Sequence, residues 1–183
     1  MEIWEILDRN GVPTGKTVER KRVCLARGEY HLVVHIWILG SDGRVLIQRR
    51  SFNKPLMSGE WAAIGGSAVV GETSAEAARR ELAEEMGIQA EPNELRLIKQ
   101  MVRKNSILNI YLLCSDVAVS DLVLQEEEVS EAKWVHRNKL RQMIKTNKFH
   151  NYGNEYFEAV FAAFDRKSAL RRRRKRYERR YKK

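Results

Sequence analysis

Short runs of apolar and β-branched residues alternate with turn sequences along most of the chain. Runs of this kind predict strands, and a tight turn between two of them predicts a hairpin. We expect strands at 2–7, 30–39, 44–50, 95–103, 107–114 and 133–135, and a shorter one near 61–64. Residues 8–15 contain Asn-Gly, Pro and Gly and are predicted to be a turn, whereas 51–66 are predicted to be mainly a loop.

Helical spacing replaces this pattern in the middle of the chain. Thr73 followed by Glu76 fits a capping box, and Gly87 is a typical C-terminal cap. These signals predict a helix at about 74–86. A second, shorter helix is predicted at 138–146.

A further helix is predicted from Asn154 onward. Its apolar residues recur at three- and four-residue spacing, so this face should dock on the body of the protein. They are Tyr156, Phe157, Val160, Phe161 and Phe164. The order of strands, one central helix, more strands and terminal helices predicts a mixed α/β (α+β) sandwich. We expect a main domain at 1–150 and a C-terminal helix with a basic tail at 151–183.

Net charge separates the tail from the rest of the chain. The 183 residues carry a formal charge of +10, yet residues 166–183 contain 12 of the 34 Lys and Arg against one acid, Glu178. Basic residues interleaved with Tyr177 and Tyr181 are typical of segments that bind nucleic-acid backbones. Nucleic-acid binding through 171–183 is therefore one interpretation of the tail. Binding to an anionic membrane surface and a solvated helix end are the others.

Composition excludes several classes of protein. The 43% apolar content is typical of a globular chain, and no apolar run reaches the roughly 18 residues of a membrane span. Cys24 and Cys114 match no disulfide or zinc spacing, and the acidic N-terminus lacks the order of a signal peptide. We therefore expect a cytoplasmic protein.

Four charged residues crowd the helix predicted at 74–86. Glu81 lies three and four positions before Glu84 and Glu85, so three carboxylates share one face next to Arg80. Like charges at this spacing destabilise a helix, and a hard divalent cation would remove the conflict. A salt-bridged surface helix would also explain these residues, so their surroundings decide.

The surroundings resemble the signature of the Nudix hydrolase family. Gly66, Glu72 and Arg80 fall at the offsets of the motif G-x5-E-x7-R-E-U-x-E-E-x-G-U, where U is aliphatic, and every position is met through Ile88. The resemblance covers roughly residues 2–146. It implies an α/β/α sandwich with a mixed central sheet, in which a loop–helix–loop carries the motif, called the Nudix box.

Resemblance to this family implies a hydrolase that cleaves a phosphoanhydride bond in a nucleoside diphosphate linked to another group. A diphosphate repels an anionic nucleophile, so such chemistry needs a cation to screen it. The resemblance implies Mg²⁺ or Mn²⁺ as cofactor, with Glu81, Glu84 and Glu85 as ligands. The partners expected are a small-molecule diphosphate substrate, whose identity stays open, and a second copy of the chain in a homodimer.

Further roles follow from the same resemblance. Arg80 orients a box carboxylate and belongs to the catalytic set, and Glu72 braces the loop. Gly65 and Gly66 let the backbone approach the metal and the substrate. Arg50, at the end of a predicted strand, is either a phosphate contact or a surface charge. The general base is either the first box glutamate or a carboxylate outside the box. The candidates are Glu81, Glu126, Glu127 and Glu128.

The chain also resembles one branch of the same superfamily, the isopentenyl-diphosphate isomerases, in EIWEILDRNGVPTG and LIQRRSFNKPLMSGEW. In those enzymes a catalytic Cys lies just before the box, and a metal-binding His comes just after that Cys. Here these positions hold Gly65 and Ser67. Of the other metal-binding positions of the isomerases, only the one at His31 keeps its residue. The other ligand positions hold Cys24, Lys104 and Ser106. Isomerisation needs an acid–base pair at carbon, so we interpret the chain as an isomerase-like scaffold with hydrolase chemistry, and isomerase activity is the alternative.

Overall fold

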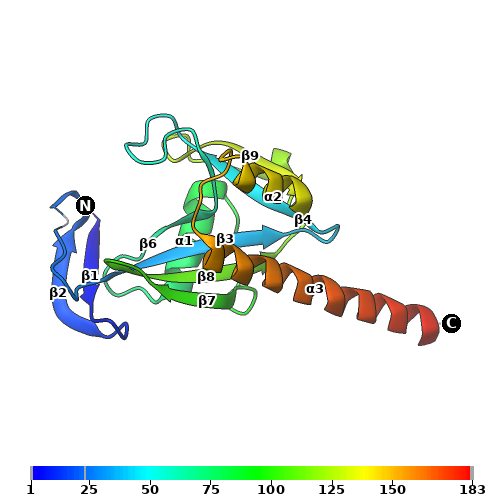
Figure 1. Cartoon of the computed structure of the whole chain (residues 1–183), viewed down its shortest axis with the longest axis horizontal. Helices are drawn as coiled ribbons and strands as arrows, with labels where there is room; N and C mark the ends of the chain where they lie inside the picture. Colours follow the sequence, from blue (N-terminus) through cyan, green and yellow to red (C-terminus); the bar gives the residue numbers. More distant parts are fainter. Residues whose placement is uncertain (1, 23, 182–183) are drawn as a thin grey trace.

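A mixed seven-stranded sheet forms the centre of the computed structural model, which describes residues 2–22 and 24–181 (Figure 1). The strands of this sheet follow the order β5-β4-β3-β8-β7, with β6 paired to β3 and β9 paired to β4. Their bounds are β3 His31–Leu39, β4 Arg44–Arg50, β5 Trp61–Ala62, β6 Ile64–Ser67, β7 Arg96–Val102, β8 Ser106–Cys114 and β9 Val129–His136. The pairing of β3 with β8 is parallel, and the other pairings are antiparallel.

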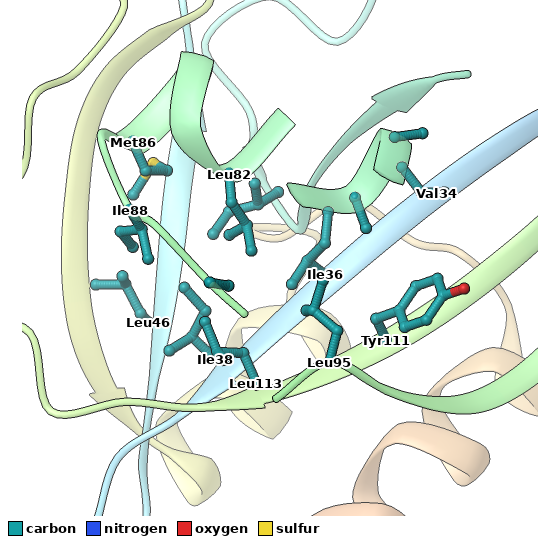
Figure 2. Packing of buried hydrophobic residues seen from close by; sticks show 14 of the residues in the cluster. Val34, Ile36, Ile38, Leu46, Leu82, Met86, Ile88, Leu95, Tyr111 and Leu113 are labelled. Carbon is teal, nitrogen blue, oxygen red and sulfur yellow. The ribbon is translucent and has the colours of Figure 1, made fainter. Parts of the chain in front are cut away.

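Helices cover both faces of this sheet. Helix α1 (Ser74–Met86) packs on the face that carries Val34 and Ile36. Its own Leu82 joins these two residues in one buried cluster, as Figure 2 shows. Helices α2 (Arg137–Lys145) and α3 (Asn154–Tyr181) lie on the opposite face. This arrangement confirms the predicted α/β/α sandwich with a mixed central sheet.

The central strand β3 explains why two cores form. Side chains alternate between the faces of a strand, and Val34, Ile36 and Ile38 belong to the α1 side, whereas Trp37 and Leu39 belong to the α3 side. All five are almost completely buried. A strand covered on both faces is apolar along most of its length, and at 30–39 only His31 and His35 interrupt the apolar and aromatic run.

The capping signals predicted helix α1 correctly. The Thr73 hydroxyl accepts a hydrogen bond from the Glu76 N–H, and the Glu76 carboxylate accepts one from the Thr73 N–H. Gly87 ends the helix in the left-handed conformation at φ 68°. The helix that carries the box is therefore capped by side chains at its start and by the backbone of Gly87 at its end.

Strand β1 (Ile3–Leu7) pairs with β2 (Pro13–Glu19) in a separate two-stranded sheet. The prediction of a turn over 8–15 was wrong for its second half. Pro and Gly are tolerated there because β2 pairs on one side only, within the part of the chain that the structure describes. The short 3-10 helices Arg20–Arg22 and Val119–Asp121 were not predicted.

Two further segments differ from the prediction. The stretch near 61–64 is two strands, β5 and β6, and Gly65 and Gly66 lie within β6 rather than in a loop. Strand β9 begins at Val129, four residues before the expected start, because it pairs with the whole of β4. Pairing between distant strands is not visible in local residue patterns.

Helix α3 contains 28 residues and continues without a break through the basic segment to Tyr181. Its first half docks as predicted, since Tyr156, Val160 and Phe164 are fully buried. The last two residues of the predicted tail, 182–183, lie outside the described residues. No helix among the described residues is long and apolar enough to cross a membrane.

Candidate active site

Two glycines bring strand β6 against helix α1. Gly66 lies so close to the helix that a Cβ atom there would overlap the carboxylate of Glu81. Gly65 lies opposite His35 in the pairing of β6 with β3, and a Cβ atom there would overlap the carbonyl oxygen of Val34. The carboxylate of Glu81 therefore rests directly on the backbone of the strand, which only glycine permits at this distance.

Arg80 links the box loop to the helix. Its guanidinium donates to both carboxylate oxygens of Glu72 and to the backbone carbonyl of Ser67. It also contacts Glu81 at 2.9 Å and Glu84 at 3.0 Å. Glu72 in turn accepts a hydrogen bond from the N–H of Val69 in the same loop. The guanidinium of Arg80 thus holds the loop and the carboxylates of Glu81 and Glu84 together.

Burial sets the electrostatics of Glu81 and Glu85. Burial raises the pKa of Glu81 to about 7, although the adjacent Arg80 guanidinium opposes this shift. Burial and the negative charge of Glu81 raise the pKa of Glu85 to about 8. The side chain of Glu85 accepts a hydrogen bond from the Gly65 N–H, yet its Oε2 atom is buried without a hydrogen-bond partner among the described residues. Two buried carboxylates, one of which raises the proton affinity of the other, form a site suited to a cation.

Glu84 takes a different position from the other two box carboxylates. Its side chain is 52% exposed and pairs with Arg80 on the helix surface. In the described ranges 2–22 and 24–181, no three His, Cys, Asp or Glu side chains come close enough to hold a metal ion. Glu81 and Glu85 come together, and the predicted set of Glu81, Glu84 and Glu85 as three ligands stays a prediction. A pair of carboxylates still fits Mg²⁺, which usually completes its shell with water and substrate phosphates.

Glu128 is the member of the acidic 126–128 run that lies nearest to the box. Its charge contributes to the raised pKa of Glu85, and its carboxylate pairs with Lys54 at 2.6 Å. Glu126 and Glu127 are exposed. Lys54 was not predicted to belong to the site, because the sequence around a lysine in a loop does not indicate which distant carboxylate it will pair with.

A third basic residue approaches the box from the N-terminal sheet. Arg20 pairs with Glu2 at 2.6 Å, and this bond raises the pKa of Arg20. The charges of Glu128 and Glu81 act in the same direction, which places Arg20 on the box side of the molecule. The pair of Arg20 and Glu2 was not predicted from sequence, since the strand β2 that leads to Arg20 was not recognised.

The opposite side of strand β6 carries an aromatic cluster around Tyr152. The ring of His35 lies 4.7 Å from that of Tyr152, and the Tyr152 hydroxyl accepts a hydrogen bond from the Ala63 N–H. Burial raises the pKa of Tyr152 to about 12, while the charges of Arg50 and Arg103 oppose this shift. The negative charge of Glu85 also acts on Tyr152, so the cluster and the box are neighbours across Gly65.

Arg50 and Arg103 supply unpaired positive charge beside this cluster. The Arg50 Nε donates to the Leu56 carbonyl at 3.2 Å, and the Arg103 guanidinium lies 6.0 Å from the centre of the Tyr152 ring. Among the described residues, neither guanidinium has a carboxylate partner at salt-bridge distance. Arg50 was predicted as a phosphate contact. Arg103 was not predicted as a phosphate contact, because a single arginine between two strands belongs to no recognisable motif.

The positions that would carry isomerase chemistry are filled differently. His31 stacks on Trp4 with ring centres 4.2 Å apart, and burial lowers its pKa to about 4. Ser67 lies 3.5 Å from His31, whereas Lys104 is exposed. Gly65 has no room for a side chain. Neither a thiol nor a carboxylate occupies the places where a proton donor and acceptor for carbon would be needed.

A mixed sheet between helices, with a glycine strand set against a carboxylate-bearing helix, defines the Nudix class of domain. The family described as NUDIX domain matches residues 29–157. The chain is 37% identical over 153 residues to the uncharacterised Nudix hydrolase lmo0368 of Listeria monocytogenes, which covers 83% of this chain and 90% of that protein. The chain belongs to the Nudix hydrolase family.

Two other comparisons describe the branch and the fold. An isopentenyl-diphosphate Δ-isomerase of Escherichia coli is 33% identical over 90 residues, which cover 49% of each chain. The crystal structure of DR0079 from Deinococcus radiodurans superposes with a TM-score of 0.72 at 22% identity, over 87% of this chain and 98% of that one. The first agrees with the predicted resemblance to the isomerase branch, and the second supports the fold.

Proposed function

We propose that this protein is a pyrophosphohydrolase dependent on Mg²⁺ or Mn²⁺. Its substrate would be a nucleoside diphosphate linked to another group, or a related nucleotide. The observation that carries the proposal is the Glu85 carboxylate, which is 3% exposed, lies against Glu81 and has one oxygen without a partner. A buried anion of this kind is costly unless a cation accompanies it.

Glu81 and Glu85 would hold the divalent cation, with Glu84 able to join them by leaving Arg80. The cation, when bound, supplies charge that screens the diphosphate and lowers the pKa of a water molecule. Arg80 keeps the carboxylate of Glu81 in place, and Gly66 keeps the strand backbone next to it. The box residues thus position charge before substrate arrives, which is the condition for electrostatic catalysis.

The general base would be Glu128, with Glu81 as the alternative inside the box. Lys54 pairs with the carboxylate of Glu128 at 2.6 Å and so restricts its position. Glu81 is held by Arg80 and packs on Gly66, so it is less free to accept a proton from water. Glu127 is exposed and is the weaker candidate of the acidic run.

Arg50 and Arg103 would bind the phosphate group that is not on the cation. Guanidinium groups recognise phosphate through paired hydrogen bonds, and among the described residues these two have no carboxylate to compete for them. Tyr152 and His35 would form an aromatic wall on the same side. Substrate would then span strand β6, with the cleaved bond at the box and its other end at the arginines.

Hydrolysis is favoured over isomerisation because the chain has no acid–base pair for carbon at the required positions. Adding the missing Cys at Gly65 would force a Cβ atom into the Val34 carbonyl oxygen. An assay of proton exchange on isopentenyl diphosphate separates the two reactions, and metal-dependent exchange would revive the isomerase alternative.

The test of the proposal is a panel of diphosphates assayed with Mg²⁺ and with Mn²⁺, using the parent and Glu85→Gln. Glu158→Gln, an exposed glutamate on α3, is the matched control. Calorimetric titration with Mn²⁺ reports cation binding separately from turnover. We expect Glu85→Gln to lose both and Glu158→Gln to keep both. Full hydrolysis by Glu85→Gln would show that the metal assignment is wrong.

A further inference from the structure

The second half of helix α3, residues 166–181, is the most strongly charged part of the described chain. We call it the basic extension. It contains ten Lys and Arg, eight of them Arg, and one acid. The first half of the same helix is held by buried Tyr156, Val160 and Phe164. The extension leads away from the sheet towards the C-terminus (Figure 1), so a rod of positive charge is anchored in the core by the first half of its own helix.

The length of this rod suits an extended partner. Sixteen residues of α-helix span about 24 Å at 1.5 Å per residue. Arg166, Lys167, Arg171 and Arg173 are all exposed, so their charges are available to a partner along several turns. Like charges at helical spacing destabilise a helix by themselves, and a polyanion bound alongside would relieve that cost.

An open groove lies at the root of the basic extension. It has a volume of about 810 Å³ and separates the helix from the β3–β4 turn. Lys167 and Arg171 line it from the helix, and Arg137 lines it from α2. Arg137 is paired with Asp165 at 2.8 Å, just before the extension begins. The exposed Lys167 and Arg171 therefore face open space, whereas Arg137 is held by Asp165.

The chemistry of the basic extension favours nucleic acid over a lipid surface. A helix that lies in a membrane interface needs a broad apolar face. From residue 166 to the end of the helix, the large apolar or aromatic residues are only Leu170, Tyr177 and Tyr181. Arginine matches phosphate by paired hydrogen bonds, and exposed aromatic rings such as Tyr177 can stack on bases.

We propose that the basic extension is a nucleic-acid-binding element that contacts the sugar–phosphate backbone without sequence preference. The inference stands apart from the hydrolase reaction, because it uses no residue of the box. It assigns the extension a partner that the family fold by itself does not require. RNA and DNA share the chemistry that would be recognised, and the experiment separates them.

The test uses the full-length chain and substitutions that keep the helix. Arg171, Arg172, Arg173 and Arg174 are changed together to Gln in one variant and to Lys in a matched control. Binding is measured by fluorescence anisotropy on a single-stranded RNA and a DNA duplex of about 20 nucleotides, and by sedimentation with vesicles of phosphatidylcholine and phosphatidylserine. Circular dichroism checks that both variants keep their helix content.

We expect the parent to bind nucleic acid with an affinity that falls about 10³-fold between roughly 50 and 200 mM salt, as about six phosphate contacts would give. The Gln variant should lose most of this affinity and salt dependence, while the Lys variant keeps them. The preferred nucleic acid is whichever of the two probes binds more tightly. Three outcomes would overturn the proposal: binding to neither nucleic acid, binding to vesicles alone, or nucleic-acid binding that the Gln variant retains.

Discussion

The guanidinium of Arg80 binds the carboxylate of Glu72 through two hydrogen bonds, from Nε to Oε1 at 2.7 Å and from Nη2 to Oε2 at 3.0 Å. The two residues are the first acid and the arginine of the box, and eight positions separate them. Their contact closes the loop onto the helix, so the positions of the box carboxylates depend on a residue that need not touch substrate.

The first prediction concerns this contact. Arg80→Lys keeps the charge but loses the paired geometry, so it should lower the free energy of unfolding by about 1–3 kcal/mol. Glu72→Gln should have a similar effect. Urea unfolding of both single variants and the double variant measures the coupling between them. Additive losses would show that the two side chains do not act as a pair.

The second prediction concerns pH. The pKa of Glu85 is raised to about 8 from an ordinary value of 4.5, so the folded state binds its proton more tightly than the unfolded state does. Its stabilising effect is full below pH 4.5 and is lost as the pH rises towards 8. Between about pH 5 and pH 8, the metal-free parent should lose on the order of a few kcal/mol relative to Glu85→Gln.

Urea unfolding of parent and variant across this pH range, in the presence of a chelator, provides the measurement. Added Mg²⁺ should restore the stability of the parent near pH 8 and leave that of Glu85→Gln unchanged. The idea fails if the two proteins lose stability in parallel, because Glu85 would then contribute nothing to the slope.

The third prediction concerns the contact of strand β6 with α1. Gly66→Ala places a Cβ atom where the Glu81 carboxylate lies, so it should cost about 1–3 kcal/mol of stability and lower hydrolysis at least about 10²-fold. Gly28→Ala is the control, since it meets no atom within 4 Å and suffers only from its φ of 90°. Equal activity losses in the two variants would remove the special role of Gly66.

The fourth prediction concerns Arg103. Arg103→Gln should raise KM about tenfold and change kcat little, because it removes a contact made equally in the ground state and the transition state. Arg96→Gln changes an exposed arginine at the start of β7, the strand that ends just before Arg103, and should leave both constants unaltered. A fall in kcat alone would place Arg103 in the chemical step rather than in binding.

The box and its helix could be predicted because their signals are local. Thr73 and Glu76 lie three residues apart and cap the first turn of α1, and Gly87 ends the helix. The buried strands at 31–39 and 106–114 could be predicted from their mainly apolar runs, for a similar reason. Where cause and consequence lie within a few residues, the sequence alone was enough.

The surroundings of the box depend on contacts between distant segments. Lys54 meets Glu128 across 74 positions, and Tyr152 reaches the Ala63 N–H across 89. Arg20 comes near Glu81 only because β2 pairs with β1, and β2 contains the Pro and Gly that indicate a turn. No local pattern records which loop will lie beside which, so these residues emerged only from the fold.

The absence of space at Gly65 has an evolutionary consequence. Two of the four glycine codons, GGU and GGC, differ from a cysteine codon by a single nucleotide. The carbonyl oxygen of Val34 occupies the position of the new Cβ, so a cysteine at position 65 must also move two paired strands. On this scaffold an isomerase thiol therefore requires a shift of backbone as well as a change of side chain.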